Sequence, residues 1–221
     1  MDPLDKGSTP WTAWLRRHRT FLRAVVSFNY DLLLEDLLRH AEMTPVYPPG
    51  ILDPLSMEKT WEHSCFLLKP HGSIEFATRP QDISMPIQPY PQNNLVELNN
   101  TRLIRIPRNK LGHPRLAAYI VLPNEYSPYL RFQWVSPGYE TFRRIANSTT
   151  HCVFLGLSYG KPDREELNFI LDALPTTTTI VEANPRPADD FRSRVVSSKR
   201  HYVHWKVHLK EELPDITSTS M

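Results

Sequence analysis

The chain has 221 residues, and its 26 Lys and Arg nearly balance its 24 Asp and Glu, which gives a formal net charge of +2 and a pI of about 8.5. So small a charge provides no field that would indicate attraction to nucleic acid or to a membrane surface. The amino terminus lacks the cationic and apolar regions of a signal peptide, and no apolar run approaches the roughly 18 residues that span a bilayer. We therefore expect a cytoplasmic protein with neither nucleic acid nor membrane as a partner.

The number and spacing of the glycines, cysteines and histidines exclude several kinds of binding site. Seven glycines, spread along the chain, form neither a G-x-G-x-x-G dinucleotide motif nor a Walker-type phosphate loop. Cys65 and Cys152 lie in separate apolar runs, which indicates two buried, reduced thiols. His201 points away from His204 and His208 in an alternating strand, and those two lie about 13 Å apart. No metal site is expected.

In the amino-terminal part of the chain, apolar residues at helical spacing alternate with short apolar runs that are typical of buried strands. In chain order, the expected elements are a helix over 11–22, a strand over 23–28, a helix over 32–40, a proline-rich loop over 43–54 and a strand over 65–69.

A segment rich in proline, over 80–136, is expected to be a loop-dominated insertion packed on the core, in which 111–122 forms one short helix or strand. After it, regular elements are expected again. They are a helix over 139–146, a strand over 152–156, a helix that begins at Pro162 and continues through Leu174, a strand over 178–183 and a half-buried strand over 201–209.

Alternating strands and helices predict an α/β fold, a mostly parallel Rossmann-like sheet flanked by helices. Residues 1–79 and 137–210 are expected to form two parts of one domain, interrupted by the insertion, with 211–221 as a flexible tail. Because the carboxyl ends of parallel strands face the ligand crevice, polar groups that follow the strands should converge there.

Two of the strands end in groups able to do chemistry. The run from Val25 ends in Asn29 and Asp31, and the run from Cys65 ends in His71. Each has a structural alternative, because Asn29 and His71 could be turn residues and Asp31 could cap the helix that follows it.

Two further motifs follow later strands, so that four occur in order: S-F-N-Y-D-L-L-L-E at 27–35, K-P-H-G-S at 69–73, F-L-G-L-S-Y-G-K-P-D at 154–163 and V-E-A-N-P at 181–185. Together they resemble the sirtuin-like domain family, and more narrowly its bacterial NAD-hydrolysing branch found in anti-phage defence proteins. The resemblance runs from about residue 24 to residue 187.

The resemblance implies that NAD is the substrate. Asn29 matches the family asparagine at the nicotinamide ribose, and His71 matches the histidine beside the ribose hydroxyls. These two are the expected catalytic residues, and Asp31 matches the acid near the carboxamide. The remaining expected NAD-binding residues are Phe28, Gly72, Gly156, Ser158, Asp163 and Asn184. For two of these the alternatives stay open, since Asp163 could stabilise a helix amino terminus and Ser158 could be a loop hydroxyl.

The chemistry gives these residue types a reason of their own. Nicotinamide is a cationic leaving group on an anomeric carbon, so its bond to ribose breaks through an oxocarbenium-like state without a strong acid. A carboxamide such as Asn29 can position water, and an imidazole such as His71 can take its proton. The expected reaction is hydrolysis of NAD to ADP-ribose and nicotinamide. Deacylation is not expected, because the cysteines of a sirtuin zinc module are missing.

One departure from the family pattern concerns the amino terminus. The family opens with a strand, a glycine-rich loop and a helix that hold the pyrophosphate. Here Gly7 is the single glycine among the residues that precede the first expected strand. We therefore expect a sheet that is incomplete at the amino terminus. The chain is then a fragment of a longer protein, an inactive nucleotide-binding or interaction module, or a chain whose sheet is completed by another. A homo-oligomer and an additional effector or sensor domain both stay open.

Overall fold

The computed structural model of the protein describes residues 9–49, 51–52, 62–78, 103–112, 119–120, 134–207 and 214–216. Its helices are α1 (Pro10–His18), α2 (Leu33–His40), α3 (Val135–Ala146), α4 (Lys161–Ala173) and α5 (Asp189–Ser197), with a 3-10 turn at Arg108–Lys110. Its strands are β1 (Ala24–Val26), β2 (Met43–Val46), β3 (Ile51–Leu52), β4 (His63–Leu68), β5 (Gly72–Ser73), β6 (Phe76–Thr78), β7 (Leu103–Arg105), β8 (Tyr119–Ile120), β9 (His151–Leu155), β10 (Thr179–Asn184) and β11 (Tyr202–Lys206).

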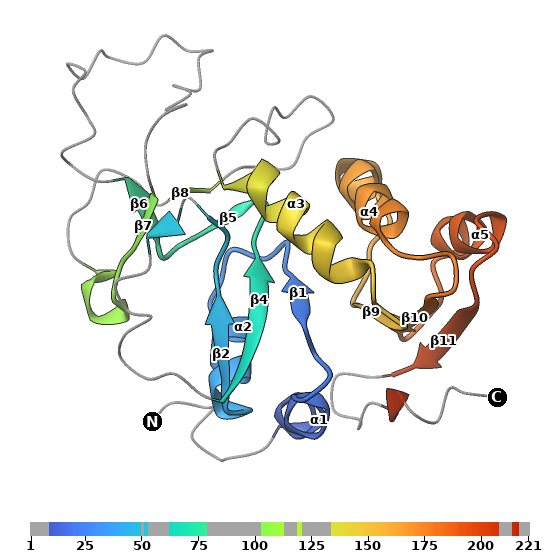
Figure 1. The fold of residues 1–221 in the computed structure, drawn as a ribbon, viewed down its shortest axis with the longest axis horizontal. Helices are drawn as coiled ribbons and strands as arrows, with labels where there is room; N and C mark the ends of the chain where they lie inside the picture. Colours follow the sequence, from blue (N-terminus) through green and yellow to red (C-terminus); the bar gives the residue numbers. More distant parts are fainter. Residues whose placement is uncertain are drawn as a thin grey trace, which may run out of the picture.

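Two three-stranded parallel sheets form the body of the fold (Figure 1). One has the order β1-β4-β2 and the other β11-β10-β9, with all neighbouring strands parallel. The central strands β4 and β10 are the most deeply buried, as expected for parallel strands covered on both faces. An α/β fold with mostly parallel strands is thus confirmed. Two smaller sheets, β3-β7-β6 and β5-β8, contain antiparallel pairs.

Helix α3 lies close to β4 because Gly138 has no side chain. A Cβ atom at this position would be 2.5 Å from Cδ1 of Leu68 and 3.2 Å from Cγ of Pro48. Leu68 is completely buried, so its side chain cannot swing away without disturbing other core residues. The same helix packs against α4, and it therefore connects the first sheet to a helix that belongs to the second (Figure 1).

Several elements differ from those expected. Helix α1 ends at His18, because the N–H groups of Phe21 and Leu22 both donate to its carbonyl and close a turn. The expected loop over 43–54 is wrong in part, since β2 and β3 lie within it. Proline does not prevent β2 because, among the described strands, β2 is at the edge of its sheet, where a missing N–H costs no ladder bond. The sequence interpretation also missed α5, which buries Phe191 and Val195 one helical turn apart.

The insertion and the carboxyl-terminal segment are described only in part. Within 80–136, the described strand β7 pairs with β3 and β6, and β8 pairs with β5. The described residues of 111–122 thus include a short strand, and the carboxyl end of the expected 201–209 strand lies outside the described residues. Residues 214–216, assigned to a flexible tail, lie against α1, where Trp14 Nε1 donates to the Pro214 carbonyl at 2.9 Å. No described helix is long and apolar enough to cross a membrane.

Replacing Gly138 by alanine should therefore destabilise the protein. We expect Gly138→Ala to lower the free energy of unfolding by about 1–3 kcal/mol, the usual cost of overpacking a buried contact. The matched control is Gly112→Ala, because a Cβ at Gly112 has nothing within 4 Å. It should change stability by no more than about 0.5 kcal/mol. Urea unfolding followed by circular dichroism measures both, and equal midpoints for the two variants would contradict the close approach of α3 to β4.

Candidate functional site

The loops that follow β1 and β4 lie side by side, so that two of the sequence motifs meet. Parallel pairing continues past the strands, where the Ser27 N–H donates to the Leu68 carbonyl at 2.9 Å. The Tyr30 carbonyl then accepts the N–H of Ile74 at 3.1 Å and the hydroxyl of Ser73 at 3.4 Å. The segment 28–31 is thereby fixed against the segment 69–75.

A buried lysine strengthens this connection. The side chain of Lys69 is completely buried, and its Nζ donates to Glu35 Oε1 at 2.9 Å and to the Asp31 carbonyl. It also lies 3.4 Å from the Ser73 hydroxyl. Sequence reasoning gave neither Lys69 nor Glu35 a role. Together they join β4, α2 and the loop after β1 at one point.

His71 lies in the centre of this region and is paired with a carboxylate. It is only 2% exposed, and its Nε2 lies 2.8 Å from Oε2 and 3.0 Å from Oε1 of Glu166 on α4. The rings of Phe28 and Tyr30 flank the imidazole, with centroids 5.3 and 6.2 Å away. His71 is therefore enclosed by two aromatic rings of the β1 loop and by α4.

Asp163, half-buried in the first turn of α4, completes a group of possible metal ligands. One ligand atom each of His71, Asp163 and Glu166 lies within 4.8 Å of the others. Such a mixed nitrogen and oxygen set could hold a divalent cation, although Nε2 of His71 is hydrogen-bonded to Glu166. Burial, and then the negative charges of Asp163 and Glu166, raise the pKa of the Tyr30 phenol. The expected absence of a metal stays a prediction.

Asn29 and Asp31 lie on the exposed side of the β1 loop. The backbone N–H of Asn29 donates to the Ser27 hydroxyl at 3.3 Å, and Asn29 itself is exposed. Asp31 Oδ1 accepts the N–H of Leu33 at 3.0 Å, at the start of α2. The residue at the N-cap position of α2 is Leu32, so the capping alternative for Asp31 is met only in part, through this one bond to the first helical N–H.

The two glycines of the expected site have left-handed backbone conformations, Gly72 at the start of β5 and Gly156 directly after β9. Gly72 has φ of 83° and Gly156 has φ of 61°, conformations in which a residue with a side chain would be strained. Gly72 donates its N–H to the Lys69 carbonyl, and Gly156 donates to the Ala183 carbonyl. Gly156 and Ser158 are exposed in the loop after β9, on the second sheet.

The side-chain amide of Asn184 is hydrogen-bonded to other groups of the protein. It is 6% exposed, and its Nδ2 donates to the Leu157 carbonyl at 3.0 Å and to Glu182 Oε1 at 2.8 Å. Glu182 is completely buried and also accepts from the Ala188 N–H and the Tyr202 hydroxyl. These bonds fasten the loop of Ser158 to the end of β10.

The structure thus divides the expected residues into two groups. The first, around β1, β4 and the start of α4, contains Phe28, Asn29, Asp31, His71, Gly72 and Asp163. The second, around β9 and β10, contains Gly156, Ser158 and Asn184. Sequence reasoning interpreted Glu166 only as an acidic residue of a first helical turn. A sharper signal was available, because Glu166 lies one turn before Ile170, on the apolar side of the helix.

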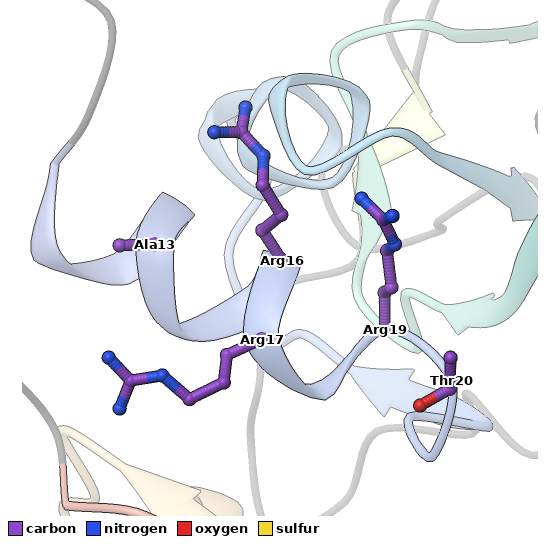
Figure 2. A pocket seen from close by; sticks show the side chains of 5 residues that line it. All are labelled: Ala13, Arg16, Arg17, Arg19 and Thr20. Carbon is purple, nitrogen blue, oxygen red and sulfur yellow. The ribbon is translucent and has the colours of Figure 1, made fainter.

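A basic surface hollow lies elsewhere, along α1 (Figure 2). It is lined by Ala13, Arg16, Arg17, Arg19 and Thr20. Arg16 donates to the His40 carbonyl at 2.6 Å and Arg19 pairs with Glu42 at 2.8 Å, so these two guanidinium groups connect α1 to the end of α2. We assign this hollow no part in the site at the strand ends.

Comparison with protein-family models finds no match for the chain, and comparison with curated proteins finds none either.

Separating Lys69 from its partner should destabilise the fold. Lys69→Met leaves Glu35 charged and buried without its cation, and we expect a loss of about 3–5 kcal/mol in the free energy of unfolding. The double variant Lys69→Met with Glu35→Leu removes both charges and should recover much of that loss. Urea unfolding of wild type, both single variants and the double variant tests this, and purely additive losses would argue against the pair.

The cysteines should be unreactive while the protein is folded. Both are free thiols, Cys65 buried and Cys152 half-buried, and burial raises the pKa of each to about 12. At pH 8 the thiolate fraction then falls from about a quarter for an ordinary thiol to about one part in ten thousand, and only a rise in pH toward 12 restores it. Iodoacetamide should label both thiols in urea and neither in buffer. Fast labelling of the native protein would contradict this expectation.

Proposed function

We propose that the chain is a sirtuin-like NAD glycohydrolase, which cleaves the nicotinamide–ribose bond to give ADP-ribose and nicotinamide. The observation that carries the proposal is the meeting of two motifs at the carboxyl ends of parallel strands. Asn29 and His71, expected from separate motifs, belong to loops that the Tyr30 carbonyl joins directly. Ligands of α/β proteins bind at this edge of the sheet.

The proposed reaction needs little acid–base chemistry. As the bond between the anomeric carbon and nicotinamide breaks, its electron pair neutralises the positive ring nitrogen. The oxygen of a water molecule, oriented by the Asn29 carboxamide, bonds to the anomeric carbon, and the proton of that water passes to the imidazole of His71. No covalent bond to the protein is formed.

The electrostatics of the site support the same reaction. The ribosyl group becomes cationic as nicotinamide departs, and Asp163 and Glu166 place carboxylates beside His71. Fixed negative charge where positive charge develops lowers the barrier more in a buried site than it would in water. We include in this proposal that the two parallel sheets are parts of one Rossmann-like sheet, and that the activity serves anti-phage defence, as the resemblance implies.

A second candidate is a nucleotide-binding or interaction module without activity. It is favoured by the internal bonds of two expected site residues, since His71 Nε2 faces Glu166 and the amide of Asn184 faces Leu157 and Glu182. This candidate predicts binding of NAD or of another protein with no release of nicotinamide.

Incubation of the purified protein with NAD, followed by chromatography of nicotinamide, tests the proposal. We expect release by wild type and a loss of about 100-fold or more in Asn29→Ala and His71→Asn, because positioning and proton transfer each contribute on that scale. The matched controls are Asn147→Ala and His201→Ala, two exposed residues that precede β9 and β11 at the opposite ends of the strands.

The outcomes of this assay distinguish an error in the assigned residues from an error in the proposed reaction. No nicotinamide release by wild type would overturn the glycohydrolase and favour the module. Release that both site variants retain would preserve the reaction and reject these two residues. Circular dichroism of His71→Asn should accompany the assay, because His71 is buried and its loss could unfold the protein.

A further inference from the structure

We propose that Glu166 is a positioning residue for His71, which holds the imidazole in one orientation and one tautomer. Its catalytic consequence rests on the proposed function, whereas the tautomer itself can be measured without any activity. The observation behind the proposal is a buried pair that joins two segments far apart in sequence, the loop after β4 and helix α4.

The geometry determines which nitrogen carries the hydrogen. Nε2 of His71 lies 2.8 and 3.0 Å from the two carboxylate oxygens of Glu166. An ionised carboxylate only accepts hydrogen bonds, so Nε2 must be the donor, and in the neutral ring the lone pair is then on Nδ1. The pair thus selects one of the two neutral tautomers.

The carboxylate is itself held firmly. Glu166 is 2% exposed, and its neighbours on α4, Leu167 and Ile170, are buried in the core. A helix whose apolar side is buried cannot rotate about its axis without exposing that side. Glu166 therefore points at the ring from a fixed element, and the rings of Phe28 and Tyr30 limit the tilt of the imidazole from the other side.

In the proposed reaction this arrangement acts on the proton-transfer step. When the imidazole takes a proton from the attacking water, it becomes an imidazolium next to the Glu166 carboxylate. The proton stays on the ring, and Glu166 stabilises the cation without being protonated. In the part of the chain that the structure describes, the charged and titratable groups beside the ring include Glu166 and Asp163 of α4 and the Tyr30 phenol of the β1 loop.

Kinetics of matched variants provide the first test. Glu166→Gln keeps the size of the side chain and removes its charge, and we expect kcat for NAD to fall about 10- to 100-fold, less than the loss of a base itself, with KM little changed. Glu166→Asp should recover part of the rate because it restores the charge. Glu165→Gln is the control, since Glu165 is the exposed neighbour on α4, and it should match wild type.

The second test measures directly which nitrogen of the His71 imidazole carries hydrogen. In ¹⁵N spectra, the resonances missing from His71→Asn belong to His71, and their shifts show which nitrogen carries hydrogen. We expect the Nε2-protonated tautomer in wild type and in Glu165→Gln, and a mixture of tautomers in Glu166→Gln. This result does not depend on NAD turnover, so an inactive wild type would reject the proposed function and leave the positioning role standing.

Three results would overturn the proposal. One is an Nδ1-protonated ring in wild type. Another is a Glu166→Gln variant that is as fast as wild type or faster, which would make Glu166 a group that blocks His71. The third is a shift of the His71 resonances on addition of Mn²⁺ or Zn²⁺ that both Asp163→Asn and Glu166→Gln abolish, which would make the cluster a metal site.

Discussion

The buried ammonium group of Lys69 is the constraint on which the arrangement of the strand ends depends. Removing a charge from water costs several kcal/mol unless strong partners compensate, and here Glu35 and the Asp31 carbonyl are those partners. Each comes from a different segment, so the position of Lys69 at the end of β4 also fixes α2 and the loop of Asn29. A second buried pair, Glu75 with Arg105, does the same for β7. The geometry of the exposed loop thus depends on charges that are themselves inaccessible to solvent.

The charges around the strand ends are not evenly balanced. Among the described residues, Lys69 pairs with Glu35, and Glu75 pairs with Arg105 and, at 3.6 Å, with Arg108, whereas His71 faces two carboxylates. A neutral imidazole leaves that part of the site negative. Such a site favours a group that gains positive charge, which is the property of a ribosyl centre losing nicotinamide, and it opposes a group that gains negative charge. This asymmetry among the described charges supports the glycoside cleavage that we propose.

Local sequence patterns predicted the helices and strands better than the contacts between side chains far apart in the sequence. Apolar runs gave β1, β4, β9 and β10, and Pro162 followed by acidic and apolar residues gave α4, because these signals depend on near neighbours in the chain. The same reasoning missed β2, whose Pro45 is harmless only at a sheet edge, and α5, whose apolar side consists of little more than Phe191 and Val195. It could place Asn29 and His71 at strand ends, yet it could not foresee the partner of His71. Glu166 is 95 positions away along the chain, and no periodic pattern reports a contact between single side chains at that separation.

The contact between His71 and Glu166 also crosses from one sheet to the other. His71 follows β4 of the first sheet, and α4 follows β9 of the second. Among the described residues, β1 pairs only with β4 and β9 pairs only with β10, so no ladder of backbone hydrogen bonds joins the sheets there. Their relative position depends on packing, above all on α3, which contacts both β4 and α4. Packed contacts respond to small displacements more readily than a continuous ladder does, and a shift of α4 of about 1 Å would already lengthen the pair beyond hydrogen-bond distance. The environment of His71 is therefore the part of the site most sensitive to how the two sheets are held together, whether by α3 alone or by any further element that joins β1 to β9.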